Sequence, residues 1–146
     1  MPDAEATTPA SIDRLLTQAR ANLVRVEAGD LRAEMAAGAL VVDTRPVDQR
    51  VRDGSLPGAV VVDRNVLEWR LDPTSPHRIP EATDAGRLII VVCNEGFSSS
   101  LAAATLRQLG LVGATDLVGG FQAWLRAGTG RSRQSTDRGS PSTSCS

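Results

Sequence analysis

The apolar run at residues 88–92, Leu-Ile-Ile-Val-Val, constrains the fold of this chain more than any other segment. β-Branched residues dominate the run, and no polar residue alternates with the apolar ones. A strand of this kind is buried on both faces, which is typical of the centre of a parallel sheet that helices cover on each side. The run stops at Cys93, so the strand would deliver a thiol to the carboxyl edge of the sheet, where ligands bind in open α/β folds.

Shorter strand-like segments alternate with helical patterns on both sides of that run. We predict further strands over residues 24–28, 40–43, 59–62 and 115–118. We predict helices that start after Ser11, over 31–37, from Pro46 to about Arg52, around 67–69, from near Ser100 to Gly110, and over 121–127. Strands that alternate with helices predict an α/β fold in which a small parallel sheet is flanked by helices on both faces.

The composition favours one domain with flexible ends. The chain has 146 residues, of which 41% are apolar, enough for one buried core. Residues 1–10 are predicted to be a disordered N-terminus, and residues 11–128 form the domain with an extra N-terminal helix. Residues 129–146 are rich in Ser, Thr, Arg, Gly and Pro, so we predict a disordered tail there.

Charge and cysteine content narrow the function classes. The formal net charge is −1 and no basic stripe stands out, so we expect neither a nucleic acid nor a membrane as partner. The two cysteines, Cys93 and Cys145, are too few for a disulfide framework, and no signal-peptide pattern is present, which together predict a cytoplasmic location. With one histidine and two cysteines the chain lacks ligands for a metal site, and we expect no cofactor.

The segment after Cys93 has the features of an anion-binding loop. It reads Asn94-Glu95-Gly96-Phe97-Ser98-Ser99 and leads into a helical pattern. Gly96 permits unusual backbone angles, and the serines offer N–H and hydroxyl donors at a helix start. Donors that converge on the sulfur, together with the helix dipole, lower the pKa of a thiol from roughly 8.5 toward neutrality. A buried structural cysteine is the alternative reading, but the loop favours a reactive thiolate.

Several ordered segments resemble the rhodanese family of sulfurtransferases over about residues 24–128. Asp43-Thr44-Arg45 and then Gly54-Ser55-Leu56-Pro57-Gly58-Ala59 are similar to the family's Asp-x-Arg and Gly-His-Ile-Pro-Gly-Ala turn. The segment from Cys93 to Ser99 resembles its active-site loop, and Gly119-Gly120-Phe121-x-x-Trp124 resembles its closing helix motif. The resemblance implies a three-layer rhodanese-like fold.

The resemblance also implies a double-displacement reaction. Cys93 would be the nucleophile, take sulfane sulfur from a donor such as thiosulfate, and pass it from a persulfide to a thiol or cyanide acceptor, or to a protein acceptor. The backbone N–H groups of Asn94, Glu95, Gly96, Phe97, Ser98 and Ser99 would cradle the anion, with Asp43 and Arg45 in support. Covalent catalysis of this kind divides one difficult transfer into two easier steps.

The chain departs from the family pattern at three positions. Ser98 stands where the loop often has Arg, Glu95 places an acid in the loop, and Ser55 stands where the turn usually has His. The first two changes each cost about 1 kcal/mol toward a dianionic donor. We therefore expect thiosulfate to be a weak donor and consider mercaptopyruvate or a protein persulfide instead.

Two other functions stay open on the sequence. A regulatory binding module could retain the fold and use Cys93 as a redox sensor. A cysteine-dependent phosphatase is the weaker alternative, because its loop reads Cys-x5-Arg whereas the seventh loop residue here is Ser99 and the nearest following arginine is Arg107.

For the remaining candidate residues we expect mainly structural or surface positions. We expect His77 at the surface, Trp124 in the core, and Trp69 either in the core or at the mouth of the pocket. Phe97 lies within the loop and is expected to face substrate, whereas Cys145 is expected to be an uninvolved thiol or, alternatively, a resolving thiol in a mobile tail.

Overall fold

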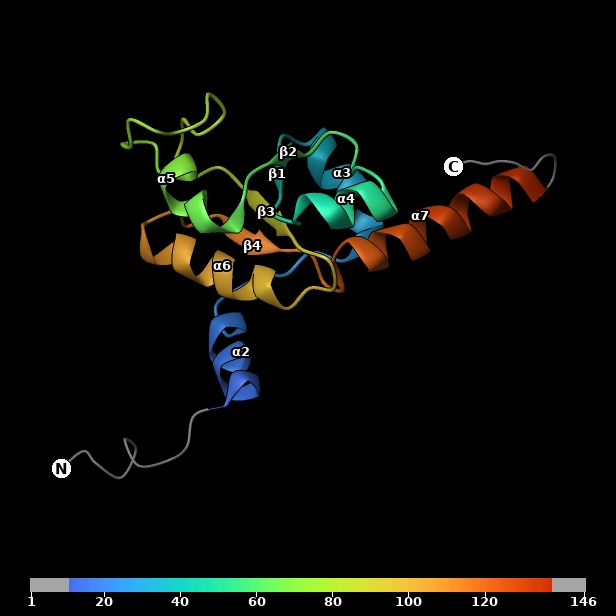
Figure 1. Ribbon diagram of the computed structural model, residues 1–146, viewed down its shortest axis with the longest axis horizontal. Coiled ribbons are helices and arrows are strands. Elements are labelled where there is room, and N and C mark those ends of the chain that lie inside the picture. The colour runs from blue at the N-terminus through green and yellow to red at the C-terminus, as the bar shows by residue number, and fades with distance from the viewer. Residues whose placement is uncertain (1–10, 138–146) are drawn as a thin grey trace.

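The computed structural model describes residues 11–137 and contains a parallel sheet between two layers of helices (Figure 1). The sheet has four strands in the order β2-β1-β3-β4, all parallel to their neighbours. Their bounds are β1 Leu40–Asp43, β2 Val60–Val61, β3 Ile89–Val92 and β4 Ala114–Asp116. The predicted α/β class and parallel sheet are confirmed.

The α-helices alternate with these strands along most of the chain. They are α2 Ile12–Arg20, α3 Leu31–Ala36, α4 Val47–Asp53, α5 Leu67–Leu71, α6 Ser98–Gln108 and α7 Gly120–Asp137. Short 3-10 turns, η1 Ala28–Asp30 and η2 Arg64–Val66, precede α3 and α5. Within residues 11–137 no helix is both long enough and apolar enough to cross a lipid bilayer.

The strand β3 lies inside the sheet, as its apolar sequence predicts. All four of its residues are buried, and it pairs with β1 on one side and β4 on the other. Side chains on a strand alternate between the two faces of the sheet, so an apolar strand in this place supplies both core layers.

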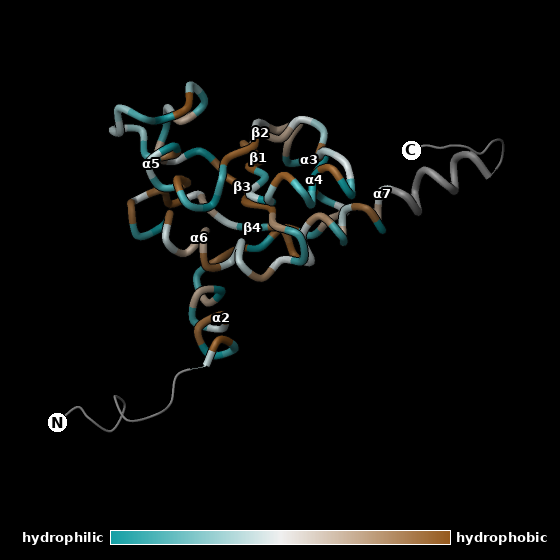
Figure 2. The backbone as a smooth tube through the Cα atoms, viewed as in Figure 1, coloured by the Kyte–Doolittle hydropathy of each residue, from teal (hydrophilic) through white to brown (hydrophobic). Residues whose placement is uncertain are grey.

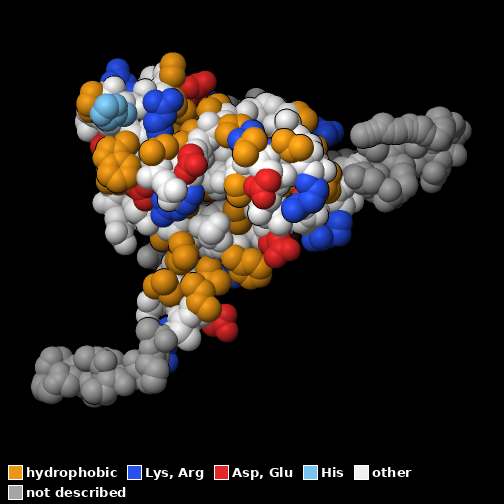
Figure 3. Space-filling model, viewed as in Figure 1, with side chains coloured by type: hydrophobic (Ala, Val, Ile, Leu, Met, Phe, Trp, Pro, Cys, Tyr) orange, Lys and Arg blue, Asp and Glu red, His pale blue; other side chains and the backbone are white. Residues whose placement is uncertain are grey.

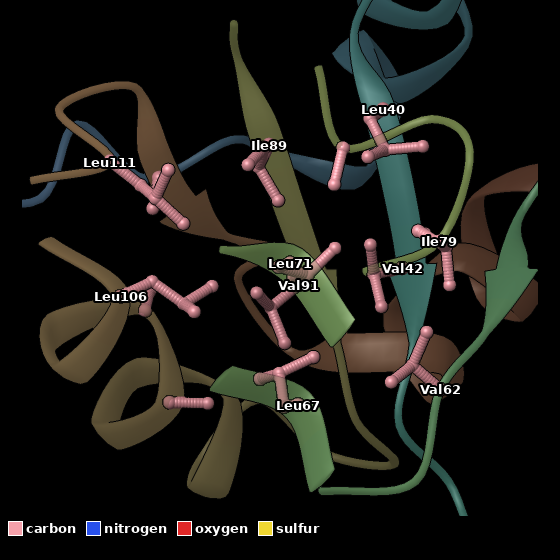
Figure 4. Packing of buried hydrophobic residues seen from close by; sticks show 14 residues of the cluster. Leu40, Val42, Val62, Leu67, Leu71, Ile79, Ile89, Val91, Leu106 and Leu111 are labelled. Carbon is pink, nitrogen blue, oxygen red and sulfur yellow. The ribbon is translucent and has the colours of Figure 1, made fainter. Parts of the chain in front are cut away.

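The two faces of the sheet have separate apolar clusters. On one face Val42 and Val91 pack with the α5 and α6 residues Leu67 and Leu106 (Figure 4). On the other face Val41, Ile90 and Val92 pack with residues of α3 and α7, including Leu31 and Phe121. In Figure 2 the tube is brown along much of β3, in the middle of the fold. Burial of each such side chain stabilises the fold by about 1.5–3 kcal/mol.

The helix α2 packs against α6, outside the two main layers (Figure 1). As predicted, Ser11 caps it, since the Ser11 hydroxyl accepts a hydrogen bond from the Arg14 N–H at 3.1 Å. Leu16 is buried, whereas Ile12 and Leu15 are half exposed or more and belong to the orange region over α2 in Figure 3. The helix therefore docks on the domain through a narrow apolar stripe.

Two predicted elements differ from the structure. The strand predicted over 24–28 is reduced to a single bridge between Val26 and Leu117, which is the residue directly after β4. The helix predicted to end at Ala127 continues to Asp137, into the segment where we predict a tail. Gly128 and Gly130 weaken a helix by about 1 kcal/mol each but do not prevent helical backbone angles, as a proline would. Residues 1–10 and 138–146 lie outside the described part of the chain.

Candidate active site

Cys93 is the first residue after β3, and backbone donors surround its sulfur. The residue is 7% exposed. The N–H groups of Gly96 and Ser99 donate to Cys93 Sγ at 3.1 and 3.3 Å. Ser99 belongs to the first turn of α6, so the sulfur lies at the positive end of that helix. This is an anion site built from the backbone.

The carbonyl groups of the same loop point away from the sulfur and are bound from outside. The Phe121 N–H donates to the Cys93 carbonyl at 2.8 Å, and the Gln122 N–H donates to the Asn94 carbonyl at 3.0 Å. Both donors belong to the first turn of α7, whose N–H groups have no partner within their own helix. The end of α7 and the loop therefore satisfy each other's backbone groups.

The Gly96 carbonyl is bound by two arginines from the N-terminal segment. Arg20 Nη2 donates to it at 2.8 Å and Arg25 Nη2 at 3.1 Å. A peptide unit is planar and trans, so fixing the Gly96 carbonyl fixes the direction of the following N–H as well. Fixed carbonyls on the outside thus hold the loop's N–H groups in place.

A buried carboxylate ties the loop to β4. Asp116 is fully buried, and its Oδ2 accepts the hydroxyl groups of Ser99 and Ser100 at 2.7 Å each. Arg25 completes the set, donating to both carboxylate oxygens at 2.8 and 3.1 Å. A buried carboxylate with this many charge-assisted partners is stable only while all of them are present.

Two glycines let α7 approach the loop this closely. Gly120 has φ +62°, and a Cβ added there would lie 2.5 Å from the Cys93 carbonyl oxygen. Gly96 has φ +87°, and its added Cβ would lie 2.6 Å from the Gly119 nitrogen. Side chains cannot occupy these positions without moving the loop.

The environment lowers the pKa of Cys93. Burial raises the pKa of the thiol, but hydrogen bonds from the Ser99 and Ser98 hydroxyls and from the Ser99 and Gly96 N–H groups together outweigh burial. The Ser99 hydroxyl has one proton and lies 2.7 Å from the Asp116 carboxylate, so we assign that proton to Asp116. The Ser98 hydroxyl and the two N–H groups then remain as the donors that stabilise the thiolate.

A hollow of about 310 Å³ opens in front of the thiol. Its lining comes from the active-site loop and from the segment after β1: Thr44, Arg45, Pro46, Gln49, Cys93, Asn94, Glu95, Phe97 and Ser98. Phe97 is 55% exposed at this mouth, and Glu95 and Ser98 are exposed as well. Four of the six loop residues predicted for the site, Asn94, Glu95, Phe97 and Ser98, line this opening, whereas Gly96 and Ser99 are buried and direct their N–H groups to the sulfur.

Asp43 and Arg45 form a buried ion pair behind the hollow. Arg45 Nη2 lies 2.8 Å from Asp43 Oδ2, and both side chains are at most 1% exposed. Arg45 also donates to the Gly54 carbonyl at 2.9 Å and stacks over the Phe121 ring at 3.6 Å. The pair therefore joins β1, the turn at Gly54 and α7, and its Asp43 carboxylate is engaged with Arg45.

The other candidate residues lie elsewhere. His77 is exposed, as expected, and Trp69 is 57% exposed and is not part of the hollow in front of Cys93. Trp124 is partly buried and contacts the Phe121 ring at 5.4 Å between centroids. Cys145 lies outside the described residues.

Sequence reasoning missed the residues that hold the loop from outside, which are Arg20, Arg25, Asp116 and Gln122. One signal was available for Asp116: it is a charged residue inside the strand predicted over residues 115–118. The arginines carried no such signal because they lie 68 or more residues from Cys93 in the sequence, and only the fold brings them to the loop.

The fold and site define a class: a parallel α/β domain with a cysteine thiol at the centre of a backbone anion loop. The model of the rhodanese-like domain matches residues 27–127, which is most of the chain. The protein belongs to the rhodanese-like domain family.

Relatives agree with this assignment. The chain is 32% identical over 87 residues to an adenylyltransferase and sulfurtransferase, MOCS3-1, of Zea mays; the match covers 60% of this chain and 18% of that protein. The chain thus spans about a fifth of the length of the curated relatives it matches.

Similar solved structures lead to the same family assignment. A Rhodopseudomonas palustris protein of unknown function, described as a possible tyrosine phosphatase, is 31% identical with a TM-score of 0.74, over 84% of this chain and 94% of that one. The human single-domain sulfurtransferase TSTD1 is 26% identical with a TM-score of 0.60, over 70% of this chain and 95% of that one. The three-layer rhodanese-like fold is confirmed.

Because α7 lies so close to the Cys93 loop, we expect Gly120→Ala to lower the unfolding free energy strongly. Gly110 also has a positive φ, +98°, but open space around it, so Gly110→Ala measures the backbone strain alone, about 1–2 kcal/mol. Gly120→Ala must also displace the loop backbone, so we expect a greater loss of unfolding free energy in urea and slower alkylation of Cys93 by iodoacetamide. Equal losses in the two variants, with unchanged alkylation, would contradict this account.

The pKa of Cys93 predicts the pH dependence of its alkylation. Because the folded pKa lies below the ordinary thiol value, the thiolate persists to lower pH than in a free cysteine derivative. We expect the iodoacetamide rate of a Cys145→Ser protein to reach half its plateau at a lower pH than that of N-acetylcysteine. Ser98→Ala should move this midpoint upward, whereas Thr105→Ala, on the same helix, should not; a midpoint equal to that of N-acetylcysteine contradicts the prediction.

Proposed function

We propose that this protein is a sulfurtransferase in which Cys93 carries sulfane sulfur as a persulfide. The observation that supports the proposal best is the loop geometry: two backbone N–H groups donate to Sγ and an α-helix begins beside it. A thiolate and a persulfide anion both need such donors. The family's sulfurtransferases and the sulfurtransferase relatives named above agree with this chemistry.

The reaction balances without an external oxidant or reductant. The Cys93 thiolate attacks the outer sulfur of a donor persulfide R–S–SH; the bond from Sγ to that sulfur forms, the S–S bond of the donor breaks, and RS⁻ leaves. An acceptor thiolate R′S⁻ then attacks the outer sulfur of Cys93–S–SH, which yields R′–S–SH and restores the Cys93 thiolate. The cradle stabilises the anion at both stages.

We propose a donor other than thiosulfate. Glu95 and Ser98 line the hollow, and no arginine of the loop itself is present to bind a dianion. A persulfide on a small thiol or on a protein carries less charge than thiosulfate, and so does mercaptopyruvate, from which Cys93 would take the sulfur by breaking its C–S bond with pyruvate as the leaving group. A cytoplasmic location, where such thiols are reduced, belongs to the same proposal.

The description of the Rhodopseudomonas palustris relative keeps phosphatase activity as a second candidate. In the loop 93–99 of this chain no arginine is available for bidentate binding of phosphate oxygens. Hydrolysis of an aryl phosphate that is abolished by Cys93→Ser would favour this candidate over sulfur transfer.

A persulfide on Cys93 is the direct test. After incubation with thiosulfate, mercaptopyruvate or an alkyl persulfide, we expect intact mass spectrometry of the Cys145→Ser protein to show a gain of about 32 Da, which dithiothreitol removes. Cyanide should remove it as well and release thiocyanate. Cys93→Ala is the matched control and should show neither the gain in mass nor thiocyanate.

Two outcomes would oppose the proposal. A gain in mass that resists both dithiothreitol and cyanide is sulfinic acid and indicates a redox-sensing module instead. Thiocyanate production that persists in Cys93→Ala would remove Cys93 from the reaction.

The proposal about the donor predicts how substitution of Glu95 changes kcat/KM. Glu95→Gln removes a negative charge from the mouth of the site, so we expect kcat/KM for thiosulfate to rise about fivefold, which corresponds to ~1 kcal/mol. The value for an uncharged alkyl trisulfide, as sulfane donor, should change little. Glu81→Gln, which alters an exposed residue outside the hollow, should leave both constants unchanged. An equal rise for both donors would contradict an electrostatic role of Glu95.

A further inference from the structure

The segment before residue 27 lies outside the matched family domain, yet it reaches the back of the Cys93 loop. Arg20 ends α2, and Arg25 follows in the chain that leads to the Val26 bridge. Both guanidinium groups donate to one acceptor, the Gly96 carbonyl. Docking of a helix on the domain does not by itself require two charged donors on the same loop carbonyl.

Arg20 makes three contacts at this place. Nη2 binds the Gly96 carbonyl at 2.8 Å, Nε binds the Ser100 hydroxyl at 2.9 Å, and the guanidinium carbon lies 5.9 Å from the centre of the Phe97 ring. The three contacts fall on the part of the loop between the Cys93 thiol and the body of α6. Arg20 therefore fixes the loop from behind while Phe97 faces the hollow.

Gly96 links Arg20 to the sulfur directly. The same residue donates its N–H to Cys93 Sγ at 3.1 Å and accepts Arg20 on its carbonyl. The Gly96 carbonyl is conjugated with the Phe97 N–H and not with the Gly96 N–H, so Arg20 acts on the sulfur through its charge and by fixing the position of Gly96. A single residue thus separates a guanidinium group from the nucleophile.

Arg20 is a cation near the Cys93 loop that has no ion-pair partner among the described residues. Four charged groups near the loop are engaged in ion pairs, namely Asp43 with Arg45 and Arg25 with Asp116. Two others form no ion pair among the described residues, which are Glu95 in the loop and Arg20 behind it. Arg20 therefore offsets the carboxylate that Glu95 adds to the site.

We propose that Arg20, with Arg25, is a positioning residue of the Cys93 site: the pair holds the Gly96 carbonyl outward, and Arg20 supplies the positive charge that the loop lacks at Ser98. The inference rests on the proposed role of Cys93 as nucleophile. It makes α2 a part of the active site, although α2 lies outside the family domain. Neither arginine is itself among the residues that line the hollow; both act through the Gly96 carbonyl, and Arg20 also contacts the Phe97 ring from behind.

The test compares two alkylating reagents of similar size and different charge. In a Cys145→Ser background Cys93 is the only thiol of the chain. Iodoacetate is an anion and iodoacetamide is neutral, so the ratio of their rate constants reports the local charge at the sulfur. In Arg20→Gln we expect this ratio to fall about threefold, and the pH midpoint of iodoacetamide alkylation to rise.

Arg20→Lys and Arg14→Gln are the controls. Lysine retains the charge, so Arg20→Lys should recover most of the ratio, whereas Arg14 is exposed on the same helix and Arg14→Gln should change nothing. Arg20→Gln leaves the Gly96 carbonyl bonded to Arg25 and the Ser100 hydroxyl bonded to Asp116, so we expect it to fold, and circular dichroism verifies this. A wild-type ratio and midpoint in folded Arg20→Gln would overturn the proposal.

The result is independent of sulfur transfer, because alkylation needs no sulfur donor. If the wild type forms no persulfide but Arg20→Gln lowers the ratio, the proposed function fails and the positioning role stands. If the persulfide forms and Arg20→Gln changes neither ratio nor midpoint, the positioning role fails and the proposed function stands.

Discussion

The site depends on one constraint: the carbonyl groups of the loop after β3 must face outward so that its N–H groups can face the sulfur. A backbone loop has no intrinsic reason to take this arrangement, because each carbonyl needs a donor of its own. Here the donors come from two directions. The first turn of α7 binds the carbonyls of Cys93 and Asn94, and arginines of the N-terminal segment bind that of Gly96. The anion cradle is thus a consequence of how distant elements pack.

Asp116 connects this cradle to the sheet. It ends β4, next to β3, and collects the Ser99 and Ser100 hydroxyls and the Arg25 guanidinium on one buried carboxylate. Removal of the Asp116 carboxylate would take away the shared acceptor of two buried hydroxyls and of Arg25, which costs more than the net value of any one of these hydrogen bonds. The network therefore specifies one position for the start of α6, and with it the distance from the Ser99 N–H to Sγ.

Local sequence patterns predicted the parts of the fold that depend on local physics. The apolar run before Cys93 identified the central strand and Ser11 identified a helix cap, while the role of the loop residues as an anion site stays a prediction. The patterns failed where contacts between distant segments determine the structure. The segment at Val26 has a strand-like sequence but pairs only through one bridge, to Leu117 just after β4. Nothing local in the sequence reveals that the fold brings Arg20 and Arg25 to the Gly96 carbonyl.

The placement of charge around the thiol bears on which donor the site favours. A loop arginine would point into the hollow and bind a dianion directly, whereas Arg20 lies behind the backbone and acts on the sulfur through Gly96. A cation behind the loop stabilises the thiolate and persulfide of Cys93 itself, while Glu95 at the mouth opposes a second negative charge that arrives with the substrate. Under the proposed function, such a division stabilises the Cys93 persulfide and disfavours thiosulfate as a donor at the same time. It is the electrostatic arrangement expected for exchange between thiols, in which every species carries at most one negative charge at the sulfur being moved.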